Sequence, residues 1–324
     1  KNIFKSKKRA AIFFFVILIL IGTATFITCS SLKGPTGGNV TPPENSDDGK
    51  IVKPEDKTVA DYMDNPNLNL YIANSVLADA GSFRSVSSGS TVSMKIGLSI
   101  TQEIYAMRIV KGDTVYKQSS SYGLVKMGDE RVVHGNTYLY RSATELKSVK
   151  DMKWSDDTPN SLTRDQFLNR YGYRGNGLTG YILNDETITS STYDGFDENN
   201  GLYSFTYVLD NDKATARMLY EMRTNSGASN FATFEKAVIH VTMDENWVVR
   251  TISTDCAYNV PMFGSTPCKE NITEEFSDIG QISDFAQFPH YDYYSKYIDF
   301  DTTPPIDDDV NPSPLPPAPD EPVE

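Results

Sequence analysis

The sequence predicts an α+β fold in which one antiparallel sheet is covered by a few helices on one face. Long stretches alternate apolar and polar residues with period two, which is typical of half-buried strands. Short turn signals separate several of these stretches, as they do in hairpins. Helical periodicity is found in three stretches that are available to cover the sheet: residues 66–80, 162–171 and 211–223.

The first half of the predicted sheet begins after the first helix, which Gly81 ends. Residues 91–100, "TVSMKIGLSI", alternate so that one strand would place five apolar side chains on the same face: Val92, Met94, Ile96, Leu98 and Ile100. Further strands are predicted at 102–110, 113–122 and 131–141, with turns at 111–113 and 127–130. These elements predict an antiparallel meander.

The second half follows the same logic. Ser161 is the predicted cap of the helix at 162–171, and Gly172 is its predicted stop. A hairpin with its turn at residues 244–246 is expected near the end of the body. The remaining predicted elements are strands at 180–193, 201–210 and 269–279 and the helix at 211–223. No residue-level repeat relates the halves, so we expect one continuous sheet.

The first 29 residues are expected to be a membrane anchor or a lipoprotein signal. Residues 1–9 carry five positive charges and no acid, and residues 10–28 are uncharged, which is about the length that spans a bilayer. Cys29 lies where the acylated cysteine of a bacterial lipoprotein would lie, although the residues before it fit that pattern badly. An uncleaved anchor, a lipoprotein signal and a cleaved signal all stay open, and each places the body on the extracytoplasmic face of a bacterial membrane.

Composition divides the rest of the chain into three parts. Residues 30–57 hold few large apolar side chains and several glycines and prolines, so we expect a flexible linker. Residues 58–300 form the predicted folded domain. Residues 301–324 are acidic and rich in proline, which predicts a disordered tail.

The charge of the body argues against one class of partner. The net charge is −13 although the first nine residues are basic, so the remainder carries about −18. A body this acidic repels polyanions, and we therefore expect no nucleic acid partner.

Two of the three cysteines are close in sequence. The loop "AYNVPMFGSTP" separates Cys256 from Cys268 and contains turn-forming residues. Outside the cytoplasm such a pair can form a disulfide, which we predict here; two free buried thiols are the alternative.

Motifs for catalysis and cofactors are weak. The G-x-G-x-x-G pattern at 175–180 follows a helical stretch and precedes a predicted strand, which is the reverse of a dinucleotide site, so it predicts a turn. The three histidines, at 134, 240 and 290, are far apart in sequence, and no serine or zinc signature occurs. We predict no catalytic residue, cofactor or metal ligand, and a protein that is not an enzyme.

The order of elements resembles a known superfamily. A helix is followed by the long strands of "TVSMKIGLSITQEIYAMRIVKGDTVYKQSSSYG", and later by "FLNRYGYRGNGLTGYILNDETI" and a closing hairpin. Over about residues 60–280 this is similar to the superfamily of the lipoprotein carrier LolA and the LppX/LprG lipoproteins. The resemblance implies a curved antiparallel sheet, an open half-barrel, with helices packed on the concave face. It also implies an apolar interior that holds acyl chains.

Two functions follow as hypotheses. The first is a non-enzymatic, membrane-tethered protein that binds a lipid or lipoprotein acyl chain in a cavity beside Met94, Ile96, Leu98 and Ile100, since three short helices would leave apolar sheet uncovered. The second is a surface interaction or sensor module whose protein partner is unknown. It would use the aromatic segment 288–300, "FPHYDYYSKYIDF", although that segment would also serve to cover the sheet. A hydrolase with acidic catalytic residues is a third, less specific possibility.

Overall fold

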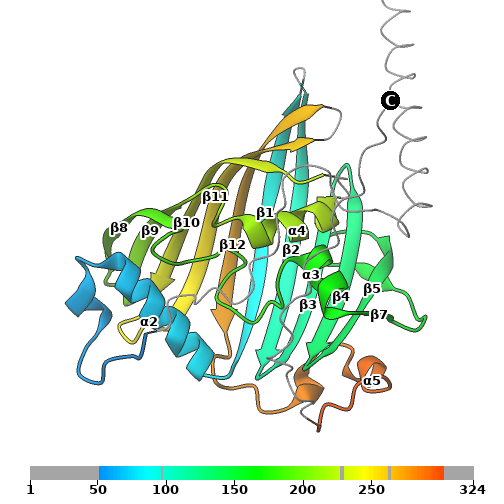
Figure 1. The fold of residues 1–324 in the computed structure, drawn as a ribbon, viewed down its shortest axis with the longest axis horizontal. Helices are drawn as coiled ribbons and strands as arrows, with labels where there is room; N and C mark the ends of the chain where they lie inside the picture. Colours follow the sequence, from blue (N-terminus) through cyan, green and yellow to red (C-terminus); the bar gives the residue numbers. More distant parts are fainter. Residues whose placement is uncertain (1–50, 96–97, 227–229, 262–263, 303–324) are drawn as a thin grey trace, which may run out of the picture. The chain divides into compact units, whose positions relative to one another are not determined.

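A computed structural model describes residues 51–95, 98–226, 230–261 and 264–302. Within these ranges twelve strands form one antiparallel sheet (Figure 1). They are β1 (Ser82–Lys95), β2 (Leu98–Lys111), β3 (Thr114–Tyr122), β4 (Lys126–His134), β5 (Thr137–Leu146), β6 (Met152–Trp154), β7 (Asn160–Leu162), β8 (Ile188–Asp197), β9 (Leu202–Leu209), β10 (Thr233–Met243), β11 (Val249–Pro261) and β12 (Ser265–Ser277).

The strands are ordered β6-β5-β4-β3-β2-β1-β12-β11-β10-β9-β8, and β7 pairs with β5. The chain therefore runs outward from the centre, crosses to the opposite edge, and returns inward until β12 pairs with β1. In the described residues the outer strands β6 and β8 do not pair with each other, so the sheet is open. This confirms the predicted fold class and the single continuous sheet.

The helices begin and end at residues suited to those positions. The main helices are α2 (Pro66–Asp79), α3 (Arg164–Tyr171) and α4 (Ala216–Ser226); η1 (Val59–Tyr62), η2 (Phe285–Gln287) and α5 (Tyr291–Tyr294) are single turns. Asn65 caps α2 by accepting a hydrogen bond from the Leu68 amide. Thr163, not the expected Ser161, caps α3 in a reciprocal bond with Gln166, and Gly172 ends it with φ 79°.

Helices α2, α3 and α4 pack on one face of the sheet, which we name the helix face. Alternate strand residues point to this face and join the helices in a single core. Its strand side chains include Val115, Val133, Phe205, Tyr207, Ile239, Val241 and Ile252. The helices contribute Leu70, Ile72, Phe167, Tyr171 and Leu219.

The C-terminal segment, residues 279–302, covers part of the opposite face. Its apolar side chains form a second core with Ile109, Tyr116, Val132 and Leu139 of β2 to β5. The segment contributes Ile282, Phe288, Tyr294, Ile298 and Phe300 to this core. The aromatic stretch 288–300 therefore acts largely as a cover for the sheet.

The prediction of one strand over 91–100 was wrong. These residues belong to a hairpin, because β1 ends at Lys95 and β2 begins at Leu98. Met94 is paired with Ser99, and the neighbouring Ser93 is paired with Ile100. Met94 and Ile100 therefore lie on opposite faces, since adjacent strand residues point in opposite directions.

Other boundaries also differ from the predictions. Residues 127–130, the expected turn, lie inside β4, and the stretch 131–141 is split by a turn between His134 and Thr137. Residues 180–187 precede β8 instead of forming part of it, and α4 begins at Ala216, later than the predicted helix. The expected turn at 244–246 is present between β10 and β11.

The predicted anchor, with Cys29, and almost all of the predicted tail lie outside the described residues, as does most of the predicted linker. Among the residues that the structure does describe, no helix combines the length and apolarity that crossing a bilayer requires.

Candidate functional site

Three basic side chains lie side by side on the helix face, and we name them the basic row. Arg108 of β2 is opposite Lys117 of β3, which in turn is opposite Arg131 of β4. Their exposed fractions are 3%, 8% and 0%. Like charges on neighbouring strands repel and are costly to bury, so this row depends on the groups that face it.

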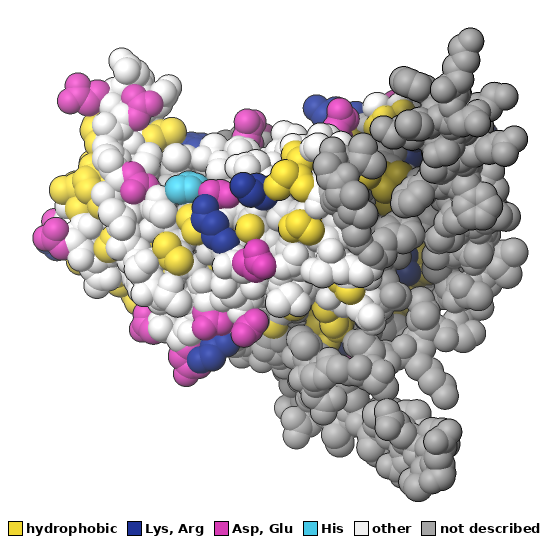
Figure 2. Space-filling view, turned by 90° about the horizontal axis from the view of Figure 1, so that it is seen from above, with side chains coloured by type: hydrophobic (Ala, Val, Ile, Leu, Met, Phe, Trp, Pro, Cys, Tyr) yellow, Lys and Arg dark blue, Asp and Glu magenta, His cyan; other side chains and the backbone are white. Residues whose placement is uncertain are grey.

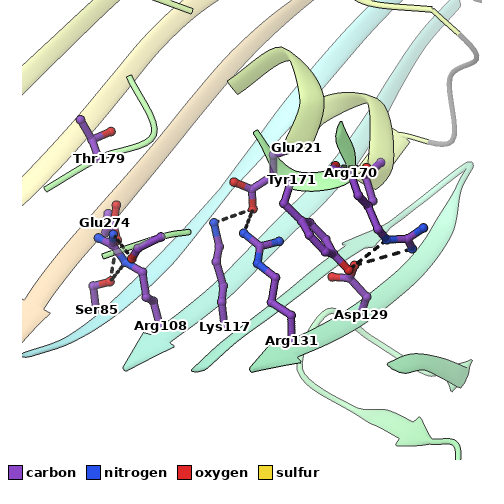
Figure 3. Close-up of polar contacts among 12 residues, drawn as sticks. Ser85, Arg108, Lys117, Asp129, Arg131, Arg170, Tyr171, Thr179, Glu221 and Glu274 are labelled. Atoms are coloured by element: carbon purple, nitrogen blue, oxygen red, sulfur yellow. Dashed lines mark hydrogen bonds and ion pairs between the residues drawn. The ribbon is translucent and has the colours of Figure 1, made fainter. Parts of the chain in front are cut away.

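All five N–H groups of Arg108 are occupied, three of them by the chain between α3 and β8, residues 172–187, which we name the crossing loop (Figure 3). Its Nη atoms donate to the carbonyls of Gly175, Gly177 and Leu178 at 2.9, 2.6 and 3.2 Å. It also bonds Ser85 Oγ at 3.1 Å and Glu274 Oε1 at 2.8 Å. Residues 175–180 therefore present carbonyl oxygens to the Arg108 guanidinium, and these bonds hold the crossing loop on the sheet.

The other two cations share one carboxylate from α4. Lys117 Nζ and Arg131 Nη2 lie 2.5 and 3.3 Å from Glu221 Oε1, and the three side chains point toward one another in Figure 3. Burial alone would raise the pKa of Glu221, but the charges of Lys117 and Arg131 lower it to about 2. Glu221 is therefore ionised at neutral pH.

Buried polar atoms without partners are concentrated here. Of the six buried side-chain atoms without a hydrogen-bond partner among the described residues, five belong to Arg131, Glu221, Ser119 and Asp129, which together with Lys117 we name the cluster. They are Arg131 Nε and Nη1, Ser119 Oγ, Asp129 Oδ1 and Glu221 Oε2. Because buried polar groups are nearly always satisfied by protein, water or ligand, this concentration marks a candidate binding position.

Helix α3 forms the other wall of the cluster. Tyr171 donates to Asp129 Oδ2 at 2.7 Å, and Arg170 Nη2 lies 4.0 Å from the same oxygen. The guanidinium of Arg131 stacks on the ring of Tyr171 with 4.0 Å to its centroid. Asp129 is thus charge-balanced by Arg170 and holds α3 over β4.

The apolar part of the helix face is closed beneath α2. A space of about 10 Å³, room for about one water molecule, lies between α2 and the crossing loop. Its lining residues are Leu70, Tyr71, Asn74, Leu178, Thr179, Tyr181 and Leu183. The expected ligand cavity is therefore not open in this structure, because the crossing loop fills the position between helix and sheet.

A second, more open hollow lies away from the basic row. It has a volume of about 320 Å³ and lies where the β8–β9 and β10–β11 hairpins turn, lined by Phe196, Gly201, Tyr203, Asp244, Glu245 and Asn246. Elsewhere on the coloured part of Figure 2, hydrophobic side chains occur in small separate groups among polar ones. That view shows no single large apolar patch.

The residues predicted for the apolar ligand face are not brought together. Met94 and Ile100 are 45% and 37% exposed near the end of the β1–β2 hairpin, on opposite faces. Ile96, and the side chain of Leu98, lie outside the described residues. The period-two pattern suggested one continuous strand, whereas β1 ends at Lys95 and the antiparallel β2 begins at Leu98.

The predicted disulfide is absent between the described cysteines, and Cys256 and Cys268 are free buried thiols. Cys256 is opposite Glu270, whereas Cys268 is opposite Tyr258, so the two thiols are diagonal neighbours on adjacent strands. Diagonal neighbours are generally farther apart than a disulfide permits. Burial raises the pKa of Cys256 to about 11, which keeps this thiol protonated.

Sequence reasoning missed the basic row. Pairing residue 111 with 114 across the expected turn would have placed Arg108 opposite Lys117, so part of the signal was present. The misplaced turn at 127–130 hid the pairing of Lys117 with Arg131. Glu221 comes from a separate helix, and no sequence spacing predicts that contact.

The histidines lie apart from the basic row. His134 contacts Thr114 Oγ1 and the Thr302 carbonyl, and His290 contacts Glu130 at 2.8 Å. His240 contacts Thr206 on the face opposite the helices. In the part of the chain that the structure describes, no three histidine, cysteine or acidic side chains are grouped as metal ligands.

No protein-family model and no curated protein sequence matches this chain. Among solved structures, one described as an outer membrane lipoprotein-sorting protein domain from Vibrio parahaemolyticus aligns with 66% of this chain and 90% of that one. Its sequence identity is 10% and its TM-score 0.21. A variant of the GphF dehydratase aligns with 64% and 84% of the two chains, at 8% identity and a TM-score of 0.15. At these TM-scores neither alignment assigns a fold or a ligand.

Proposed function

We propose that this chain is a non-enzymatic, membrane-tethered binding protein on the extracytoplasmic face of a bacterial membrane, and that it binds the apolar chain of a lipid or lipoprotein. The observation that carries the proposal is the helix face of β8 to β12. Its buried apolar side chains form one continuous layer, and the cover over part of it is helix α2 and an irregular loop.

The cover over this layer is held in part by polar contacts. Tyr71 of α2 donates to Asp185 of the crossing loop at 2.7 Å. Trp247 Nε1 donates to Asn69 Oδ1 of α2 at 2.6 Å. Separation of α2 from the loop would expose an apolar crevice, and each methylene of an acyl chain buried there contributes about 0.8 kcal/mol.

Tethering is proposed from the sequence of residues 1–29, which combines a basic start with a long uncharged stretch. The absence of a nominated catalytic group in the sequence supports the proposal that the protein binds without catalysis.

The alternative of a protein-interaction module built on residues 288–300 is less well supported. Phe288, Tyr294, Ile298 and Phe300 are at most 6% exposed, because they pack on the sheet. Tyr291 and Tyr293 are half-buried, and Tyr297, at 42%, is the one aromatic side chain of the segment that is exposed, so the aromatic surface left for a partner is small.

Uptake of an acyl chain tests the proposal. Native mass spectrometry of the full chain released from detergent should detect bound palmitate, and a fluorescent palmitate should bind with saturation. Thr179→Trp should weaken uptake about tenfold, because Thr179 lines the crevice. The matched change Thr192→Trp, on exposed β8, should leave uptake unchanged. No uptake by the unmodified chain, or equal uptake by both variants, would contradict the proposal.

A further inference from the structure

We propose that the basic row binds the anionic headgroup of a single-chain lipid, and that Glu221 is the resident carboxylate which that headgroup replaces. This inference rests on the proposed binding of an acyl chain and adds the charge of the ligand and the position of its polar end.

The balance of charge supports an anionic ligand. The three cations of the basic row face two carboxylates, Glu221 and Glu274, which leaves one positive charge in excess. Nearby Arg170 and Asp129 balance each other. An unbalanced buried cation is unfavourable, so a headgroup that takes the place of Glu221 must itself be anionic, and one with two negative charges would also remove the excess.

The two arginines of the row differ in a way that identifies the binding position. Arg108 donates to five oxygen acceptors and has no capacity left. Arg131 donates to Glu221 alone, and its Nε and Nη1 atoms are buried without a partner. Guanidinium N–H groups without a partner are charged donors that suit carboxylate and phosphate oxygens.

A further donor lies on the same face of the sheet. Ser119 is the next residue of β3 on the same face as Lys117, and its buried Oγ has no partner. Lys117, Arg131 and Ser119 therefore supply an ammonium, two guanidinium nitrogens and a hydroxyl. Glu221 engages Lys117 Nζ and Arg131 Nη2 through one oxygen and leaves Arg131 Nε and Nη1 and Ser119 Oγ without a partner, whereas a headgroup with two or three oxygens offers further acceptors to these donors.

Replacement of Glu221 leaves the other wall of the site intact. Asp129 keeps its contacts with Tyr171 and Arg170, so only the carboxylate on α4 has to leave. The apolar crevice is close, because the Leu178 carbonyl bonds Arg108 while Leu178 also lines the crevice. An acyl chain in the crevice would thus have its polar end toward the basic row.

The test compares ligands that share a sixteen-carbon chain. Native mass spectrometry of the full chain measures binding of palmitate and hexadecyl phosphate, which are anionic, against hexadecanol, which is neutral. We expect the anions to bind about tenfold more tightly or better, as hydrogen bonds to charged groups imply. Arg131→Gln should abolish this preference without loss of hexadecanol binding. Lys236→Gln, which removes an exposed cation paired with Asp255, is the matched control and should preserve the preference.

A second variant is expected to gain affinity, which misfolding would not produce. Glu221→Gln removes the competing charge, so anion binding should strengthen several-fold while hexadecanol binding stays constant; exposed Glu275→Gln should have no effect. Equal binding of palmitate and hexadecanol, or equal effects of the two glutamate variants, would refute the inference while leaving the proposed function. Failure of all three ligands would refute both. Inorganic phosphate that stabilises the chain as strongly as hexadecyl phosphate would overturn the assignment to a lipid headgroup.

Discussion

At the scale of single residues, buried carboxylates are satisfied in two opposite ways. Glu221 and Glu130 are paired with cations, whereas Glu270 on β12 has only hydroxyl partners, Thr91 and Tyr258, at 3.1 and 3.0 Å. Burial raises the pKa of Glu270, and the two hydroxyl bonds oppose that rise only in part. A charge at this position therefore costs stability.

Glu270→Gln is expected to stabilise the protein at alkaline pH. Below the unfolded pKa, near 4.5, the carboxyl is protonated in both states and costs nothing. As the pH rises above that value the unfolded state loses its proton first, so stability falls until the raised folded pKa is passed. The variant lacks this loss and should be about 1 kcal/mol more stable at pH 8. Urea unfolding at pH 5 and pH 8 measures this difference in stability, with exposed Glu275→Gln as the control. If Glu270→Gln left the pH dependence of stability unchanged, the raised pKa of Glu270 would be contradicted.

Glu130→Gln is expected to destabilise the protein, which is the opposite of the effect expected for Glu270→Gln. Glu130 is fully buried and bonds Arg141, Tyr116, Tyr294 and His290. Burial alone would raise its pKa, but the bond and charge of His290 and the charge of Arg141 lower it. The stabilisation is present above pH 4.5 and is lost as the pH falls through the lowered folded pKa.

Loss of this charge leaves Arg141 buried without its counter-ion, which should cost about 3 kcal/mol at pH 7. Urea midpoints of Glu130→Gln and of exposed Glu145→Gln on β5 provide the comparison. The residue 279–302 segment should also become more sensitive to protease, since two of the partners belong to it. Equal midpoints for the two variants would show that Glu130 does not fasten the segment.

At the scale of elements, the sequence predicted the helices and turns whose start and stop signals lie in neighbouring residues. Helix α2 matched its periodicity, and Gly112 turned the β2–β3 hairpin as expected. The hairpin between β1 and β2 was missed because its turn interrupts an unbroken alternation, and alternation alone does not show where a strand reverses. Contacts such as Glu221 with Lys117 depend on where α4 lies over the sheet, which no local pattern specifies.

The junction of α3 and α4 depends on one glycine. Gly172 has φ 79°, and a Cβ there would lie 2.0 Å from the backbone carbonyl of Arg217 in α4. Gly112 also has positive φ, 54°, but a Cβ there would meet nothing within 4 Å. Gly112→Ala should therefore cost about 1 kcal/mol from the backbone alone.

Gly172→Ala should cost about 1–3 kcal/mol more than Gly112→Ala, because the helices must also move apart. Thermal or urea unfolding of the two variants measures the difference. Equal losses would mean that the close approach of α3 and α4 contributes nothing beyond the strain of the left-handed conformation.

At the scale of the whole described unit, the order of strands joins distant parts of the chain. The first strand pairs with the last, so the sheet is complete only when residues almost 200 apart in sequence have met. The crossing loop and α4 then lie over β2 and β3, which come from the first half of the sheet. Such non-local pairing predicts slow, cooperative folding of the two halves together.

The residue 279–302 segment is expected to be necessary for a soluble fold. Ending the chain after Asp278 would uncover Ile109, Tyr116, Val132 and Leu139 and leave Glu130 with fewer partners. Exposure of several buried side chains, at about 1.5–3 kcal/mol each, should cost 5 kcal/mol or more and increase binding of a hydrophobic dye. A chain ended after Thr302 keeps this cover and should match the full chain in urea midpoint and dye binding. If both shortened chains unfold at the same urea concentration, the second core contributes little and the sheet is stabilised by its helix face alone.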